Sequence, residues 1–219
     1  MCEDYLVQWI NVKGALVEVE GITGSGKSTQ VELLAAALQS RGFKVTVFSY
    51  PDYASEYGQL IRKFLDGELD LDASAQFLLY LLDIVKDKAK ILEKLDEGHV
   101  VILDRYFMAT IAHQSAGGFD VENAKNIVRL LEIPCPDLVF YVEVPVPETY
   151  NRKFGEQKKF DRFEKNALFL QEVAKKYDTL CKEQFLTRWV KLDGTKKVTR
   201  VGATAIAEVL RIMKTRHQG

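Results

Sequence analysis

Short apolar runs alternate along the chain with longer segments in which apolar residues recur at helical spacing. The short runs predict five strands, at residues 16–19, 44–49, 100–103, 138–144 and 189–192. Helical spacing appears between them, at residues 30–38, 55–65, 72–95, 121–131 and 201–213. Two further helices are expected, one that begins at residue 147 and one that ends near residue 184. Strands that alternate with helices predict an α/β fold, with a five-stranded parallel sheet and helices on both faces.

One charged residue interrupts the first predicted strand. A central parallel strand is normally apolar throughout because helices cover both of its faces, yet Glu18 stands between Val17 and Val19. We therefore expect Glu18 to be paired or protonated, or else the strand to be less covered than is usual.

The division of the chain follows from its length. Residues 1–14 precede the first predicted strand, and we expect them to be an N-terminal extension. Residues 15–219 are expected to form a single domain, since α/β domains commonly reach this size.

The composition, with 47% hydrophobic and 28% charged residues, is that of a globular protein. A formal net charge of -1 provides no basic field, so we expect no nucleic acid partner. No segment approaches about 18 consecutive apolar residues, and the N-terminus lacks the basic start of a secretion signal. We therefore expect no membrane span and a cytoplasmic location. The three cysteines are widely spaced and suggest no disulfide framework, which agrees with that location.

The pattern Gly21-x-x-x-x-Gly26-Lys27-Ser28 follows the first strand and precedes the first helix. In this context it predicts a phosphate-binding P-loop, whose N–H groups and following helix N-terminus attract an anion. Lys27 is expected to reach the β- and γ-phosphates, and the Ser28 hydroxyl to hold Mg²⁺. The residues predicted to bind the triphosphate are Gly21, Ile22, Thr23, Gly24, Ser25, Gly26, Lys27, Ser28 and Thr29.

Asp104 and Arg105 come directly after the third predicted strand. The ligand crevice of an open α/β sheet lies at the carboxyl ends of its strands. Asp104 is therefore predicted to organise Mg²⁺, and the alternative for it is a residue at the strand end that caps a turn. Arg105 is suited to bind an acceptor phosphate, and the alternative for it is a structural salt bridge.

A cluster of basic residues flanks Gly155 and predicts a small lid at about residues 152–162. Such a segment would close on bound phosphates and exclude water, whereas the alternative is a solvated charged turn. The cluster consists of Arg152, Lys153, Lys158, Lys159 and Arg162.

Three motifs in this order resemble the thymidylate kinase family. They are Glu20-Gly21-x-x-Gly24-x-Gly26-Lys27-Ser28-Thr29-Gln30, Asp104-Arg105-Tyr106 and Asp161-Arg162-Phe163-Glu164, and the similarity runs from about residue 16 to 210. The resemblance implies a P-loop NTPase three-layer sandwich. It also implies a kinase that moves the γ-phosphoryl group of ATP-Mg²⁺ to dTMP, and that tends to form homodimers.

The resemblance also implies roles for individual residues. Because Gly24 stands where some members have a loop arginine, the lid residues Arg152 and Arg162 are implied as catalytic, beside Lys27, Asp104 and Arg105. For the acceptor it implies that Arg105 holds the phosphate and that Tyr80 stacks on the base. The acceptor residues implied are Pro51, Tyr80, Arg105, Tyr106, Thr110 and Gln114.

Three positions depart from the family pattern. Thr23 stands in place of a loop aspartate, Tyr53 near the position of an arginine, and Ile84 in place of the arginine that bonds a thymine carbonyl. Loss of that donor weakens the prediction of strict thymine selectivity. The alternatives are a kinase for another pyrimidine nucleotide such as dUMP or for a deoxynucleoside, and a P-loop protein that acts as a regulatory switch.

Overall fold

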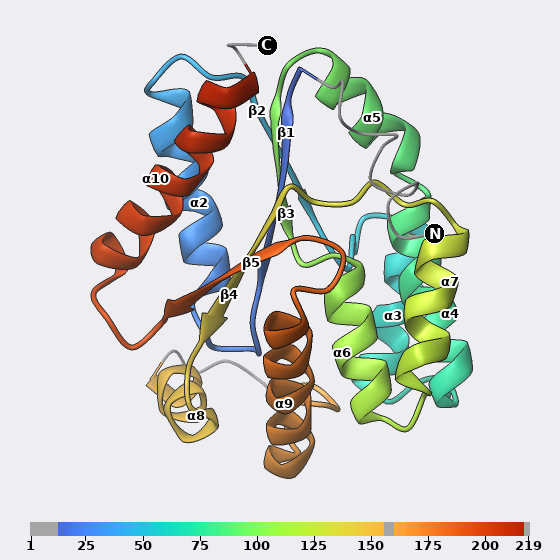
Figure 1. Ribbon diagram of the computed structural model, residues 1–219. Coiled ribbons are helices and arrows are strands. Elements are labelled where there is room, and N and C mark those ends of the chain that lie inside the picture. Colours follow the sequence, from blue (N-terminus) through green and yellow to red (C-terminus); the bar gives the residue numbers. More distant parts are fainter. Residues whose placement is uncertain (1–12, 156–159, 217–219) are drawn as a thin grey trace.

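Five parallel strands form the middle layer of the fold, in the order β2-β3-β1-β4-β5 (Figure 1). The computed structural model describes residues 13–155 and 160–216, and in that part the predicted sheet is confirmed. Val17 of β1 lies between Ile102 of β3 and Leu138 of β4, so β1 is central. The strands are β1 Ala15–Glu20, β2 Val45–Ser49, β3 Val100–Asp104, β4 Leu138–Glu143 and β5 Arg188–Asp193.

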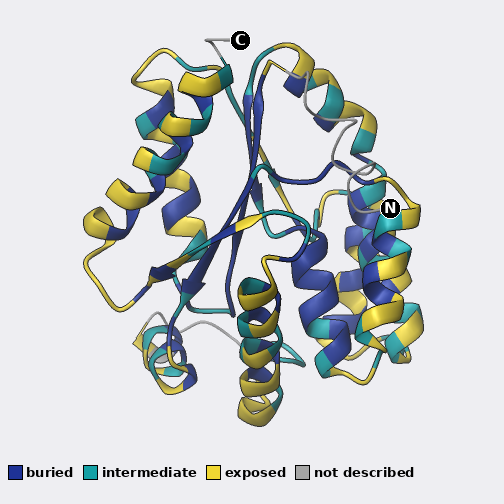
Figure 2. Ribbon diagram, viewed as in Figure 1, coloured by how far each residue is buried: buried dark blue, intermediate teal, exposed yellow. Residues whose placement is uncertain are grey.

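Helices cover both faces of this sheet, as predicted. Helices α2 and α10 pack on one face, and α4, α5, α6, α7 and α9 contribute buried side chains to the other, which leaves the three central strands β1, β3 and β4 almost wholly buried (Figure 2). The helices are α2 Lys27–Gln39, α3 Glu56–Asp66, α4 Ala73–Val85, α5 Lys88–Asp96, α6 Phe107–Ala116, α7 Val121–Leu130, α8 Val146–Gly155, α9 Ala167–Glu183 and α10 Val198–Arg216.

Strand β1 is buried along its whole length, so the expectation of a less covered strand is wrong. Val17 and Val19 face α2 and α10. Glu18, with 0% of its surface exposed, lies on the opposite face, as side chains alternate along a strand. Burial, and then the negative charge of Glu20, raise the pKa of Glu18 well above its usual value, which favours the protonated carboxyl.

The predicted single helix over residues 72–95 is wrong, because the chain forms two helices, α4 and α5. Asp87 lies between them and donates its backbone N–H to the Ile84 carbonyl, which tightens the last turn of α4. The Asp87 carbonyl then accepts the first helical hydrogen bond of α5, from Ile91. Apolar periodicity continues across this break, so the pattern alone did not reveal it.

Helix α6 was not predicted. Eight of its ten residues are buried, on nearly all sides of the helix. A helix that is apolar all round lacks the contrast between two faces that identifies helices in a sequence.

Parts of two predictions lie outside the described residues. They are residues 1–12 of the N-terminal extension and, in the lid, Lys158 and Lys159. Among the helices that the structure does describe, none has both the length and the apolar character needed to cross a membrane.

Candidate functional site

A cavity of about 370 Å³ lies at the carboxyl ends of the central strands. It brings together residues from β2, β3, α4, α6 and the loop before α2. The positions that depart from the family pattern, Thr23, Tyr53 and Ile84, also line it. The predicted site residues in its lining are Thr23, Lys27, Ser28, Pro51, Tyr80, Asp104, Arg105, Tyr106, Thr110 and Gln114.

The loop before α2 has the backbone conformation that its glycines permit. Gly24 has φ 77°, and an added Cβ there would lie 2.9 Å from Thr149. Gly26 has φ 91° and directly precedes the first turn of α2. Both values lie in the left-handed region that glycine adopts without steric cost. A loop of this conformation before a helix N-terminus is suited to bind an anion through backbone N–H groups and the positive end of α2.

Lys27 is the first residue of α2 and lies among charged groups. Burial, and then the nearby Arg105 guanidinium, lower the pKa of Lys27 to about 8, against opposing contributions from Asp104, Glu20 and Glu164. A lysine that lies beside a second cation favours the binding of an anion, because the anion relieves their repulsion.

Ser28 and Asp104 are 76 residues apart in sequence but in contact. The Ser28 hydroxyl donates a hydrogen bond of 2.7 Å to Asp104 Oδ2. Asp104 Oδ1 is buried and has no hydrogen-bond partner within the described residues. A buried carboxylate oxygen without a partner, next to a hydroxyl, is a donor set that fits Mg²⁺.

Arg105 has φ 67°, which is uncommon for a residue with a side chain. Its Nη1 lies 3.4 Å from the Tyr177 hydroxyl and 3.9 Å from Glu20 Oε2. The long distance to Glu20 makes a weak ion pair. This salt bridge therefore does not use all of the N–H donors of the Arg105 guanidinium. The arrangement orients Arg105 at the cavity wall.

Glu20 was not predicted as a site residue. Its Oε1 accepts backbone hydrogen bonds from Tyr106 at 3.0 Å and Ala109 at 3.1 Å, and its Oε2 accepts one from the Tyr177 hydroxyl at 2.6 Å. The carboxylate thus caps the N-terminus of α6 and orients the residues around Arg105. The available signal was its position at the end of β1, directly before the P-loop.

Two side chains of α6 line the acceptor side of the cavity. Both amide atoms of Gln114 are buried and have no hydrogen-bond partner in the described part of the chain. His113, which sequence reasoning passed over, lies with Nδ1 2.9 Å from the Ala109 carbonyl oxygen. A carbonyl only accepts, so Nδ1 carries the proton. Burial, and then Arg105, lower the pKa of His113 to about 3, which keeps it neutral.

The two predicted lid arginines lie in different surroundings. Arg152 donates to the backbone carbonyls of Ser25 at 3.2 Å and Gly194 at 2.9 Å, so it contacts the P-loop. Arg162 instead pairs with Asp70 at 2.8 Å, and its guanidinium lies 4.6 Å from the centre of the Phe64 ring. The structure therefore brings Arg152, and not Arg162, to the phosphate-binding loop.

Comparison with known proteins gives a consistent picture. The family model for thymidylate kinase matches residues 19–204. A thymidylate kinase of Halothermothrix orenii is 32% identical over 192 residues, which cover 84% of this chain and 91% of that protein. One of Leptospira borgpetersenii is 33% identical over 84% of this chain and 87% of that protein. A probable thymidylate kinase of Pyrococcus horikoshii is 37% identical over 64% of this chain and 70% of that protein.

Proposed function

The chain belongs to the thymidylate kinase family of ATP-dependent nucleoside monophosphate kinases, and from this premise we propose how its residues divide the phosphorylation of dTMP. One observation carries the proposal. A single cavity contains Lys27 and the Ser28–Asp104 pair together with Arg105 and the unpartnered amide of Gln114. The first group suits the phosphates of ATP, and the second suits a phosphorylated acceptor.

On the side of the phosphoryl donor, the loop amides of residues 21–29 and Lys27 bind the phosphates of ATP. Ser28 and Asp104 are the residues that would hold Mg²⁺, and the unpartnered Oδ1 of Asp104 supports this assignment. The ion would neutralise charge on the phosphates. The protein adds positive charge where negative charge develops in the transition state, which is the main catalytic need of phosphoryl transfer.

On the acceptor side, Arg105 binds the phosphate of dTMP, because a guanidinium pairs with phosphate through two parallel hydrogen bonds. Tyr80 stacks on the base, and Pro51, Tyr106, Thr110 and Gln114 complete the pocket. Arg152 acts as the catalytic arginine of the lid at residues 152–162, supported by its contact with the P-loop. For Arg162 we propose a role in fixing the lid against α3, supported by its contact with the Phe64 ring of α3 and by its pairing with Asp70 in the segment that follows α3.

Removal of the Lys27 ammonium tests the phosphoryl-transfer machinery. Lys27→Ala should lower kcat by about a hundredfold or more, because one charge that stabilises the transition state is lost. The measurement is coupled ADP release with ATP and dTMP. Lys94→Ala, at a half-buried position of α5 outside the cavity lining, is the control and should be unchanged. Near-normal turnover in Lys27→Ala would contradict the assignment.

We further propose that the acceptor site accepts pyrimidines other than thymine, such as the uracil of dUMP. Ile84 is buried in the cavity wall and offers no hydrogen bond to a base. Gln114 can present either its oxygen or its nitrogen, since neither atom has a hydrogen-bond partner among the residues that the structure describes. Without a fixed donor at residue 84, the pocket discriminates less between bases that differ in their hydrogen-bonding edge.

Restoring a fixed donor tests this second proposal. Acceptors are compared by kcat/KM with dTMP, dUMP, dCMP, UMP and AMP. Ile84→Arg should raise the preference for dTMP over dCMP by about tenfold or more, since the thymine carbonyl accepts and the cytosine amino group does not. Ile84→Leu keeps the apolar wall and serves as the control. An unchanged preference in Ile84→Arg would show that residue 84 does not read the base.

We also propose that the protein forms a homodimer and acts in the cytoplasm, where nucleotide substrates are available. The dimer is supported by exposed leucines on α4, Leu78 at 58% and Leu82 at 44% exposure, which lie on one face of the helix.

A further inference from the structure

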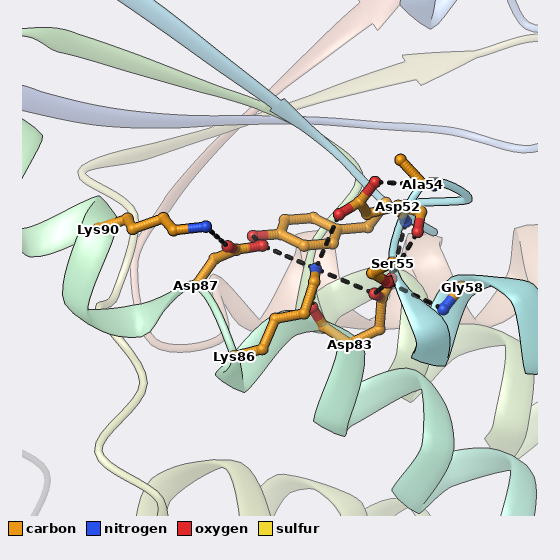
Figure 3. Close-up of polar contacts among 9 residues, drawn as sticks. Asp52, Ala54, Ser55, Gly58, Asp83, Lys86, Asp87 and Lys90 are labelled. Atoms are coloured by element: carbon orange, nitrogen blue, oxygen red, sulfur yellow. Dashed lines mark hydrogen bonds and ion pairs between the residues drawn. The ribbon is translucent and has the colours of Figure 1, made fainter.

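Two segments of the chain form walls of the acceptor side of the cavity. The segment after β2 contributes Tyr50, Pro51 and Tyr53, and helix α4 contributes Tyr80 and Ile84. The two segments come from different parts of the sequence, so something must set the distance between them. A cluster of charged residues behind these walls connects them (Figure 3).

Asp83, near the end of α4, makes the first connection. Its Oδ2 accepts the backbone N–H of Asp52 at 2.8 Å, and its Oδ1 accepts the Ser55 hydroxyl at 2.9 Å. Ser55 in turn accepts the N–H of Gly58 and begins α3. An added Cβ at Gly58 would lie 1.9 Å from the Asp52 carbonyl oxygen, so the two backbones are in close contact.

Lys86 lies at the centre of the cluster (Figure 3). Its Nζ is 3.3 Å from Asp52 Oδ2, 3.0 Å from Asp83 Oδ1 and 2.7 Å from Asp87 Oδ2. It also lies 5.1 Å from the centre of the Tyr50 ring. One ammonium group therefore contacts both the segment after β2 and the end of α4.

The ammonium group is charged despite its partial burial. Burial lowers the pKa of Lys86, but hydrogen bonds to Asp87 and Asp83 outweigh this effect and raise the pKa above its ordinary value. Asp83 and Asp87 are both buried. Without Lys86, these two carboxylates and that of Asp52 would repel one another, and two of them would be buried without the cation they share.

Tyr50 links the cluster to the cavity. Its ring lines the cavity, while its hydroxyl lies 3.4 Å from Asp87 Oδ2. The ring therefore has the acceptor pocket on one side and Lys86 with Asp87 on the other. Movement of the cluster would move this wall of the pocket.

We propose that Lys86 is a positioning residue for the acceptor nucleotide, which holds the Tyr50–Tyr53 wall against helix α4 and so sets the width of the base pocket. This inference rests on the proposed location of the acceptor base between these walls. The phosphates of ATP bind at the P-loop, and none of the residues in the cluster belongs to that loop.

The test replaces the charge and keeps the length of the side chain. Lys86→Met should raise the KM for dTMP by about tenfold and leave the KM for ATP within about twofold. Lys86→Arg restores a cation that can contact the three carboxylates and should recover most of the dTMP affinity. Lys90→Met is the matched control, because Lys90 also pairs with Asp87 at 3.2 Å but is 71% exposed.

Several outcomes would overturn the proposal. One is a folded Lys86→Met variant whose KM for dTMP is unchanged, or whose KM values for dTMP and ATP rise equally. Another is a lower kcat or a lower stability without a selective rise in the KM for dTMP. A third is a Lys90→Met variant with the same effect as Lys86→Met. If Lys86→Met does not fold, Lys86→Gln, which keeps a neutral hydrogen-bond donor, is judged by the same criteria.

A separate variant distinguishes failure of this inference from failure of the proposed pocket. Tyr80→Ala removes the proposed stacking partner of the base without touching the cluster. If it leaves the KM for dTMP unchanged, the base does not lie between these walls. If it raises that KM while Lys86→Met does not, the pocket stands and the positioning role of Lys86 is wrong.

Discussion

At the scale of single residues, a few charged side chains determine the behaviour of the site and of the strand beneath it. Burial, and then the positive charge of Arg105, lower the pKa of Lys27, whereas Asp104, Glu20 and Glu164 oppose that effect. Glu18 and Glu20 occupy one face of β1, where burial is the main influence on Glu18 and Glu20 accepts hydrogen bonds from Tyr106 and Ala109 at the N-terminus of α6. Burial thus favours the protonated form of the Glu18 carboxyl.

Glu18 makes stability depend on pH. The pKa of Glu18 is raised in the folded state. The stability that its protonated carboxyl contributes is therefore fully present below the unfolded pKa, near 4.3, and is lost as pH rises through the folded pKa. Glu18→Gln should therefore raise the free energy of unfolding, by about 1 kcal/mol or more at pH 8 and little at pH 5. Urea unfolding between pH 5 and pH 8 measures the difference.

Glu32→Gln, at an exposed position of α2, is the control for this series and should show no such trend. A Glu18→Gln variant that is less stable than the parent at every pH would indicate that the ionised carboxylate contributes favourably in the fold.

At the scale of elements, Glu20 connects β1, α6 and α9, because Tyr177 of α9 donates to it. Tyr177→Phe removes one hydroxyl that serves Glu20 at 2.6 Å and Arg105 at 3.4 Å. The variant should lose about 1 to 3 kcal/mol of unfolding free energy and show a higher KM for dTMP, since Arg105 is less well oriented.

Tyr57→Phe is the control for Tyr177→Phe, because Tyr57 lies on α3 and does not line the cavity. Chemical denaturation and the KM for each substrate are the measurements. Equal values for Tyr177→Phe and the parent would show that the hydroxyl does not couple α9 to the site.

The sequence predicted those parts of the site that adjoin one another along the chain or follow from strand direction. The P-loop is contiguous, and Asp104 meets Ser28 because the ends of parallel strands share one edge of the sheet. Tyr177 could not be predicted, because it reaches Glu20 across 157 residues. Helix α6 and the break at Asp87 were missed because neither changes the local apolar pattern.

At the scale of the whole molecule, the parallel sheet and the membership of the thymidylate kinase family confirm the central predictions. The roles of individual site residues and the division into an extension and one domain stay predictions. The homodimer also stays a prediction, and a measurement of molecular mass can test it.

Light scattering of the purified protein should give twice the 24.9 kDa mass of one chain. Leu82→Glu should shift the protein toward the monomer, because a charge would then be buried in the proposed interface. Leu130→Glu on α7, where the parent side chain is 80% exposed, is the matched control. A dimer unaffected by Leu82→Glu would exclude the α4 face, and a monomeric parent would exclude the dimer.

Arg152 donates to two main-chain carbonyl oxygens, that of Ser25 in the P-loop and that of Gly194 directly after β5. Every amino acid carries such an oxygen, so neither contact depends on the partner's side chain. Gly194 is constrained for another reason, since an added Cβ would lie 2.5 Å from Val144. During evolutionary drift, residue 25 could change its side chain and still keep this contact with Arg152. Among related sequences, the arginine should therefore vary independently of residue 25.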